Sequence, residues 1–377
     1  MAKKLVRVWL SLTIVLFSSI TIYADENVQG DFFVKHVIIN GEEIINYNLQ
    51  YPFFIYDSTM YFPLSPEMGE ICGFTAEMDW ESRTLKILKT DSTRENISTN
   101  WMKNNMEDIN TDVLPEVTVA CYEKIDYKTG LLPASMGLGE DFIFTPATEI
   151  LTSIARPELS VEEIDLEGMP VLSSGNYIFF PVRTLAESET LNWDIYFDPY
   201  YGICISTNED ISAETYCDKD EVLYNKGLVA YMQNYNSGIK DAYGQELLFF
   251  FKRATDVYSV ETELLMAIAH KESTFNASAT ARGGALGMMQ VMPATGANYG
   301  LSREQLYDAK TSIDFGAMYI SERIAAYGGD WTKGLSAYNQ GSSVVNRGTH
   351  STAYATNILS AYNGIQNFVT INGYVAQ

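Results

Sequence analysis

The spacing of apolar and polar positions changes once along this chain of 377 residues, close to residue 210. Before that point, short runs of alternating apolar and polar residues are separated by turn residues, which is the pattern of β-strands. In "HVIINGEEII", Asn40-Gly41 stands between two apolar runs, the strongest short-range hairpin signal. The run "RTLKILK" predicts a further strand. We therefore expect the first half of the chain to be β-rich, with small helices.

From about Ser212 onward, apolar residues recur every three to four positions, as in "GQELLFFFKRATDVY". This period predicts amphipathic helices. One helix is expected to begin at Ser259 as its N-cap, with Glu261 and Glu263 in the first turn, where the helix dipole favours acidic side chains. The predicted fold class is thus a multidomain chain with an N-terminal β-rich α+β module and a mostly α C-terminal domain.

The helix expected after Ser259 carries a carboxylate on its apolar face. Leu265, Ile268 and Glu272 follow one another at steps of three and four positions, which places them on one stripe of the helix. Burial disfavours the charged form of a carboxylate and raises its pKa, so Glu272 could stay protonated near neutral pH and act as a general acid. The alternative is a carboxylate at a helix end that bonds a neighbouring backbone group or an arginine.

Two polar motifs follow Glu272. In "STFNASATARGGALGMMQVMPAT", glycines interrupt the helical propensity and let the backbone approach a ligand closely, while Gln290 and Thr295 offer an amide and a hydroxyl. Further on, "GLSAYNQGSSVV" sets Tyr338 and Asn339 beside a glycine. Sugar hydroxyls and acetamides need such partners, so these motifs indicate carbohydrate recognition.

In this order, the pieces resemble the catalytic domain of the family 1 soluble lytic transglycosylases, which has a goose-lysozyme-like α fold. The resemblance covers about residues 241–365 and rests on Glu272-Ser273 with Phe275-Asn276, on "GALGMMQVMPAT" and on "AYNQG". It implies that Glu272 is the sole catalytic acid/base and that Tyr338 sits against its carboxyl. The substrate-binding residues it implies are Ser273, Gln290, Tyr338 and Asn339.

The resemblance implies a peptidoglycan lytic transglycosylase, and the first residues, described below, add the expectation that it is exported. Such an enzyme cuts the glycan strand between N-acetylmuramic acid and N-acetylglucosamine and leaves a 1,6-anhydro end. One departure is Ala281, which stands where the family often has a serine, with Thr280 beside it. A hydrolytic muramidase on the same fold is the nearer alternative and needs a second carboxylate, for which Asp308, Asp314 and Asp330 are available. The other alternative is a non-catalytic protein that binds the cell wall.

The β-rich half contains a predicted duplication. Residues 38–44 resemble residues 165–171, and residues 61–87 resemble residues 179–205. Each unit combines a hairpin, an aromatic-Pro entry to a short helix and a pair of strands. Over about residues 31–207, the pattern resembles the copper amine oxidase N-terminal-like domain, a stalk or spacer of exported Gram-positive proteins, and nothing in it implies copper.

The expected domain organisation follows from these boundaries. The chain would have a signal peptide at 1–24, the duplicated stalk at 25–207 with an insertion at about 91–140, a helical linker at 208–240 and the lysozyme-like transglycosylase domain at 241–369.

The first residues have the pattern of a secretion signal. Lys3, Lys4 and Arg7 precede an apolar stretch of roughly 15 residues, and Ala24 marks the expected cleavage site. An uncleaved membrane anchor is the alternative, but the stretch falls short of the ~20 apolar residues that span a bilayer. We expect the mature protein to be secreted and associated with a Gram-positive cell wall. Peptidoglycan is its expected partner, and contacts of the stalk with other envelope proteins are left open.

Charge and metal-ligand content exclude several classes of function. The net charge is −23, from 48 acidic and 25 basic residues, which repels phosphate backbones and makes nucleic acid an unsuitable partner. The three histidines, His36, His270 and His350, are far apart and none belongs to a cluster with ligand spacing, so we expect no metal site and no cofactor. His270 is expected at the solvent edge of its helix.

Two further residue groups leave alternatives open. Four cysteines in an exported chain permit two disulfides, with Cys204–Cys217 as the first expectation, or four separately buried thiols. An aromatic cluster could form a carbohydrate-stacking surface or the core of a strand-turn unit. Its members are Tyr196, Phe197, Tyr200 and Tyr201.

Overall fold

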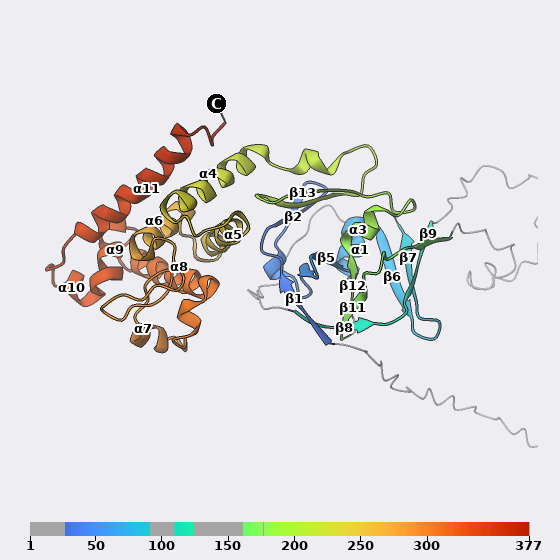
Figure 1. Cartoon of the computed structure of the whole chain (residues 1–377), viewed down its shortest axis with the longest axis horizontal. Helices are drawn as coiled ribbons and strands as arrows, with labels where there is room; N and C mark the ends of the chain where they lie inside the picture. Colours follow the sequence, from blue (N-terminus) through green and yellow to red (C-terminus); the bar gives the residue numbers. More distant parts are fainter. Residues whose placement is uncertain (1–26, 91–108, 124–160, 176, 377) are drawn as a thin grey trace, which may run out of the picture.

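The computed structural model describes residues 27–90, 109–123, 161–175 and 177–376. Among these residues, strands predominate up to residue 206 and helices from residue 219 onward, and the two parts lie side by side in Figure 1. The predicted β-rich N-terminal and mostly α C-terminal regions are confirmed. The expected signal peptide lies outside the described residues, and within the described ranges no helix combines the length and apolar character needed to cross a membrane.

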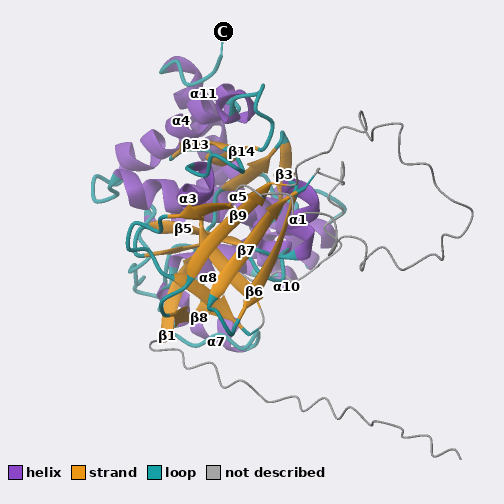
Figure 2. Cartoon of the chain, turned by 90° about the vertical axis from the view of Figure 1, so that its right-hand side faces the viewer, coloured by secondary structure: helices purple, strands orange, loops and turns teal. Residues whose placement is uncertain are grey.

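The strands form a closed barrel and two four-stranded sheets. The barrel runs in the order β1 (Asn27–Phe32), β4 (Phe54–Tyr56), β5 (Thr59–Pro63), β12 (Tyr177–Pro181), β11 (Val171–Ser174) and β8 (Ile109–Leu114). One sheet has the order β10 (Val161–Ile164), β9 (Thr118–Glu123), β7 (Thr84–Lys89) and β6 (Phe74–Asp79), of which β6, β7 and β9 are seen side by side in Figure 2. The other has the order β13 (Asp194–Asp198), β14 (Gly202–Ser206), β2 (His36–Ile39) and β3 (Glu42–Ile44).

The predicted hairpin at Asn40-Gly41 is confirmed. Strands β2 and β3 pair antiparallel with Val37 opposite Ile44, and the two turn residues have φ angles of 53° and 85°. A two-residue turn with both φ angles positive matches the twist of the flanking strands, which is why Asn-Gly is favoured there. The strand predicted in "RTLKILK" is also present, as β7.

The two halves of the β-rich region repeat one order of elements. Along the chain, the first half has strands β1 to β5, helix α1 (Pro66–Cys72) and then strands β6 and β7. The second half has strands β8 to β12, helix α3 (Val182–Ala186) and then strands β13 and β14. The last strand of each half pairs with the other half, because β7 runs parallel to β9 and β14 runs parallel to β2. In this arrangement the counterpart of the β2–β3 hairpin is the pair β9–β10. At the predicted counterpart, residues 165–171, Glu167 and Gly168 repeat the positive φ angles of Asn40 and Gly41, at 50° and 82°. The predicted hairpin there is wrong, because this turn connects β10 to β11, which lie in different sheets. The family of this region stays a prediction.

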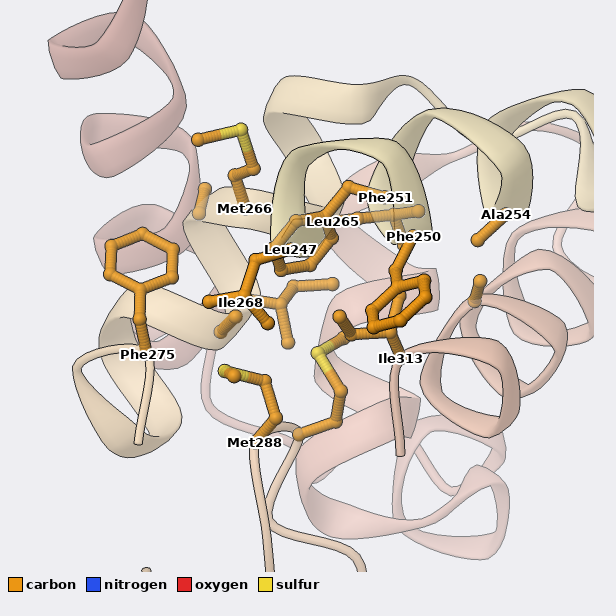
Figure 3. Packing of buried hydrophobic residues seen from close by; sticks show 14 of the residues in the cluster. Leu247, Phe250, Phe251, Ala254, Leu265, Met266, Ile268, Phe275, Met288 and Ile313 are labelled. Atoms are coloured by element: carbon orange, nitrogen blue, oxygen red, sulfur yellow. The ribbon is translucent and has the colours of Figure 1, made fainter. Parts of the chain in front are cut away.

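The C-terminal region is a helical bundle around one buried helix. Its helices are α4 (Lys219–Tyr235), α5 (Asp241–Tyr258), α6 (Thr262–Ser273), α7 (Pro293–Ala297), α8 (Ala309–Ala326), α9 (Trp331–Gln340), α10 (Ser342–Asn346) and α11 (Ala353–Ile371). Six consecutive residues of α6, from Leu264 to Ala269, are buried, so this helix is apolar all round and forms the centre of the core. Figure 3 shows Leu265 and Ile268 close to Leu247 and Met288.

Two expectations about the helices need correction. Ser259 does not cap α6, because it ends α5 in a left-handed conformation with φ 53°, and Glu261 takes the N-cap position of α6. The predicted Cys204–Cys217 disulfide is absent. All four cysteines are buried thiols, and Cys204 and Cys217 lie in one small apolar cluster.

The β-rich and helical regions share a buried contact. Phe32 belongs to the hydrophobic core of the helices, and Tyr47 packs against the same core. Beside it, the His36 ring lies between two carboxylates, with Nδ1 2.6 Å from Glu43 Oε1 and Nε2 3.0 Å from Glu221 Oε1. Burial alone would lower the pKa of His36, but the two hydrogen bonds outweigh it and raise the pKa to about 9.

This contact predicts a pH-dependent part of the stability. Because the folded pKa of His36 lies above its ordinary value of 6.5, protonation stabilises the fold fully below about pH 6.5, and this contribution is lost as pH rises through 9. The shift corresponds to about 3 kcal/mol. Denaturant unfolding of the wild type should therefore show a fall in the free energy of unfolding across that window, and His36→Asn should lack it. Equal pH dependence in the two proteins would contradict the assignment.

Candidate active site

Glu272 lies in the last turn of the buried helix α6. The helix ends where Thr274 and Phe275 adopt left-handed φ angles of 53° and 56°, and the Phe275 ring returns to the core with 1% exposure. The Thr274 and Phe275 N–H groups donate to the carbonyls of His270 and Ala269, which closes the helix end. Glu272 is therefore held on a rigid element whose end cannot fray without exposing a core phenylalanine.

The Glu272 carboxyl accepts a hydrogen bond from a tyrosine. The Tyr354 hydroxyl donates to Glu272 Oε1 over 2.6 Å. Burial raises the pKa of Glu272, and the hydrogen bond from Tyr354 opposes part of that rise. Among the residues that the structure describes, no lysine, arginine or histidine forms an ion pair with this carboxyl. The alternative of a helix-end carboxylate bonded to backbone or arginine does not apply here.

Tyr354 is the site residue that the sequence motifs miss. It is the second residue of α11 and lies 82 positions after Glu272. No motif quoted for the resemblance includes it, and none of the sequence patterns described above singles it out. Its contact with Glu272 depends on the packing of α11 against α6.

Tyr338 lies near Glu272, but its hydroxyl bonds another group. Its hydroxyl donates to the Met289 carbonyl over 3.0 Å, so the hydroxyl that meets the Glu272 carboxyl belongs to Tyr354 instead. The Tyr338 and Tyr354 rings are nearly parallel, with centroids 6.5 Å apart. Burial, together with the nearby Glu272 charge, raises the pKa of Tyr338 well above its ordinary value. Tyr338 thus supports Tyr354 and the loop before α7.

The glycine-rich loop after Glu272 is held by two of the predicted substrate-binding residues. The Ser273 hydroxyl donates to the Met288 carbonyl over 2.7 Å. The Gln290 amide Nε2 donates to the carbonyls of Gly287 at 2.9 Å and Ala279 at 3.3 Å. Both side chains therefore shape the loop, and a direct contact of either with substrate stays a prediction.

Asn339 and the position of the missing serine lie at the surface. Asn339 is exposed on α9, beside Tyr338. Thr280, next to Ala281, is also exposed and shares a hydrogen bond of 2.8 Å with the Tyr307 hydroxyl. The hydroxyl closest in sequence to the missing serine is thus already paired.

The three acids that a hydrolase could use have structural partners. Asp308 and Asp330 cap helices α8 and α9, accepting from the backbone N–H groups of Thr311 and Lys333. Asp314 forms an ion pair with Arg253.

The remaining candidates also have structural contacts. His270 is half-buried at the edge of its helix, where its Nδ1 lies 2.6 Å from the Tyr231 hydroxyl and its ring packs on Tyr235. Burial, with a smaller effect from Lys271, lowers the pKa of His270 to about 4. No group of three potential metal ligands occurs in the described ranges.

The aromatic cluster before α4 does not form one continuous surface. Tyr201 is buried, Phe197 is half exposed, and the Tyr200 hydroxyl donates to Asp241 Oδ1 over 2.7 Å. Tyr196 lies under the Lys219 ammonium, 4.2 Å from its ring centroid. These contacts fit the expectation of a structural strand-turn unit.

The region that holds this site matches a known domain family. Residues 249–362 match the Transglycosylase SLT domain, which confirms the transglycosylase domain predicted from the motifs. Among known proteins, the chain is 31% identical over 110 residues to the transglycosylase of Enterobacteria phage PRD1, covering 29% of this chain and 40% of that protein. It is 36% identical over 90 residues to the membrane-bound lytic murein transglycosylase C of Edwardsiella ictaluri, covering 22% and 25%.

The matches are confined to part of each protein. The chain spans 40% or less of the length of these curated relatives. A solved structure, the 70 kDa soluble lytic transglycosylase from Escherichia coli, aligns with 42% of this chain and 32% of its own, at 21% identity and a TM-score of 0.31.

Proposed function

We propose that the protein is a peptidoglycan lytic transglycosylase in which Glu272 is the only acid/base. The observation that carries the proposal is a half-buried carboxyl with a raised pKa, bonded by a tyrosine hydroxyl, inside the segment that matches the SLT domain. The substrate is the glycan strand, cut between N-acetylmuramic acid and N-acetylglucosamine.

One carboxyl suffices for this reaction because the substrate supplies the nucleophile. Protonated Glu272 gives its proton to the glycosidic oxygen as the bond to the muramic acid anomeric carbon breaks. The resulting carboxylate takes the proton of the muramic acid 6-hydroxyl, whose oxygen attacks the same anomeric carbon. A 1,6-anhydro ring forms, and no water is consumed. Attack within one sugar ring also avoids the cost of bringing in a separate nucleophile.

The two influences on Glu272 suit both halves of this cycle. Burial favours the neutral carboxyl that must donate first. The hydrogen bond from Tyr354 stabilises the carboxylate that remains afterwards. We infer that the glycan is bound by Asn339, by the Gln290 amide oxygen and by the face of Tyr338.

The rival functions have less support. A hydrolytic muramidase needs a second free carboxylate, and Asp308, Asp314 and Asp330 are each paired with backbone or arginine. A non-catalytic wall-binding protein would not need a desolvated carboxyl bonded by a tyrosine. Export, a location at a Gram-positive wall and a spacer role for the β-rich region are part of the proposal. They rest on the sequence pattern that predicts a signal peptide and on the resemblance of residues 31–207.

The products of digestion test this proposal directly. Purified peptidoglycan treated with the protein should release anhydromuropeptides, which mass spectrometry identifies as lighter by one water than hydrolytic products. Reducing-end muropeptides as the main product would instead indicate a hydrolase. Binding of glycan without cleavage would place the protein in the binding class.

A further inference from the structure

We propose that Gln340, the last residue of α9, is a positioning residue that sets the Tyr354 hydroxyl against Glu272. The inference rests on the proposed function and concerns the same site. The Gln340 side-chain amide bonds both backbone groups of Ser351: its Nε2 donates to the Ser351 carbonyl over 2.6 Å, and its Oε1 accepts from the Ser351 N–H at 2.9 Å. A side-chain amide with both ends occupied has one defined orientation.

The two hydrogen bonds between Gln340 and Ser351, here called the clamp, join the two ends of the segment that separates α9 from α11. Gly341 ends α9 with φ 84°, and the chain then passes through the short helix α10 before it reaches Ser351. The Ser351 hydroxyl accepts from the Ala353 N–H over 3.2 Å, at the first residue of α11. Thr352, the N-cap of α11, makes no side-chain capping bond. Hydrogen bonds through Ser351 therefore connect the first turn of α11 to α9, and the two shortest of them to α9 come from Gln340.

Tyr354 lies in that first turn, three residues after Ser351. Its bond to Glu272 is 2.6 Å long, so a displacement of about 1 Å would remove it as a hydrogen bond. Helix α9 holds Tyr354 through the Tyr338 ring and through the two bonds of Gln340 to Ser351. The Ser336 hydroxyl adds a longer bond of 3.5 Å to the Ser351 carbonyl. Loss of the clamp frees the start of α11 while leaving the Tyr338 contact and the core of α11 in place.

A double-mutant cycle tests whether Gln340 acts through Tyr354. In wild-type background, Gln340→Ala should lower kcat on purified peptidoglycan about tenfold with little change in KM. In a Tyr354→Phe background, the same substitution should cause no further loss, because the hydroxyl that it positions is already gone. Gln366→Ala is the control: Gln366 is exposed on α11, the helix that carries Tyr354, and its amide bonds the Tyr362 hydroxyl.

The pKa of Glu272 gives a second readout that does not depend on activity. Since the Tyr354 hydrogen bond lowers the pKa of Glu272, Gln340→Ala and Tyr354→Phe should each raise it, and Gln366→Ala should not. Carbon NMR of the labelled glutamate carboxyl measures this shift, and the high-pH limb of kcat/KM should move the same way. Equal losses of activity in both backgrounds, or an unchanged Glu272 pKa in a folded Gln340→Ala protein, would overturn the inference. Absence of anhydromuropeptides from wild-type digests would instead refute the proposed function, and the NMR shift would still decide the role of Gln340.

Discussion

Glu272→Gln is expected to lower the rate of peptidoglycan cleavage by about a thousand- to ten-thousand-fold. The substitution keeps the size of the side chain and a group that can accept from the Tyr354 hydroxyl, but it removes the transferable proton. Because one carboxyl serves both proton transfers, neither step retains its acid or base. Release of muropeptides measures the rate, and binding of insoluble peptidoglycan should persist.

Helix α6 supplies a matched control for this variant. Glu263 lies at the other end of the same helix and also accepts a hydrogen bond from a tyrosine hydroxyl, that of Tyr224. Glu263→Gln makes the same chemical change on the same helix and should leave the rate within about twofold. Unchanged digestion by folded Glu272→Gln would remove Glu272 from the mechanism.

The raised pKa of Glu272 sets the direction of the pH dependence. The free enzyme must hold Glu272 protonated, so kcat/KM should fall as pH rises through this pKa. Burial moves that fall toward higher pH than an ordinary glutamate would give.

Gly287→Ala is expected to destabilise the protein by about 2–5 kcal/mol and to remove most of its activity. Gly287 has φ 76°, and a Cβ placed there would lie 1.8 Å from the Leu306 carbonyl oxygen. The methyl group can be accommodated only if the backbone of the loop or of Leu306 moves. The Gly287 carbonyl accepts from Gln290, so the movement would also disturb the loop beside Glu272. Denaturant unfolding and muropeptide release measure the two effects.

A neighbouring glycine separates this effect from a general intolerance of the loop. Gly283 has no atom within 4 Å of its Cβ position and lacks the positive φ angle. Gly283→Ala should therefore change stability by less than about 1 kcal/mol. Similar losses in both variants would show that the close contact with Leu306 is not the cause.

Local spacing in the sequence was enough to predict the β-rich and helical regions, the Asn40-Gly41 hairpin and part of the candidate site. The Asn40-Gly41 hairpin forms because both turn residues tolerate positive φ, a property of those residues alone. Glu272 follows from the apolar period of its own helix. The helix start at Ser259 was predicted wrongly because serine is a favoured N-cap residue. In the structure, Ser259 is instead the C-cap of the preceding helix, in a left-handed conformation.

Contacts between distant segments were decided only by the tertiary structure. In the β-rich region, the last strand of each half pairs with a strand of the other half: β7 runs parallel to β9, and β14 runs parallel to β2. No local sequence pattern specifies this pairing. The tertiary structure also decides which tyrosine hydroxyl bonds the Glu272 carboxyl. Tyr338 and Tyr354 are both tyrosines near helix ends, and only the packing of α11 against α6 selects Tyr354 as the partner. A period along one helix states which face is buried, but not which side chain of another helix will meet it there.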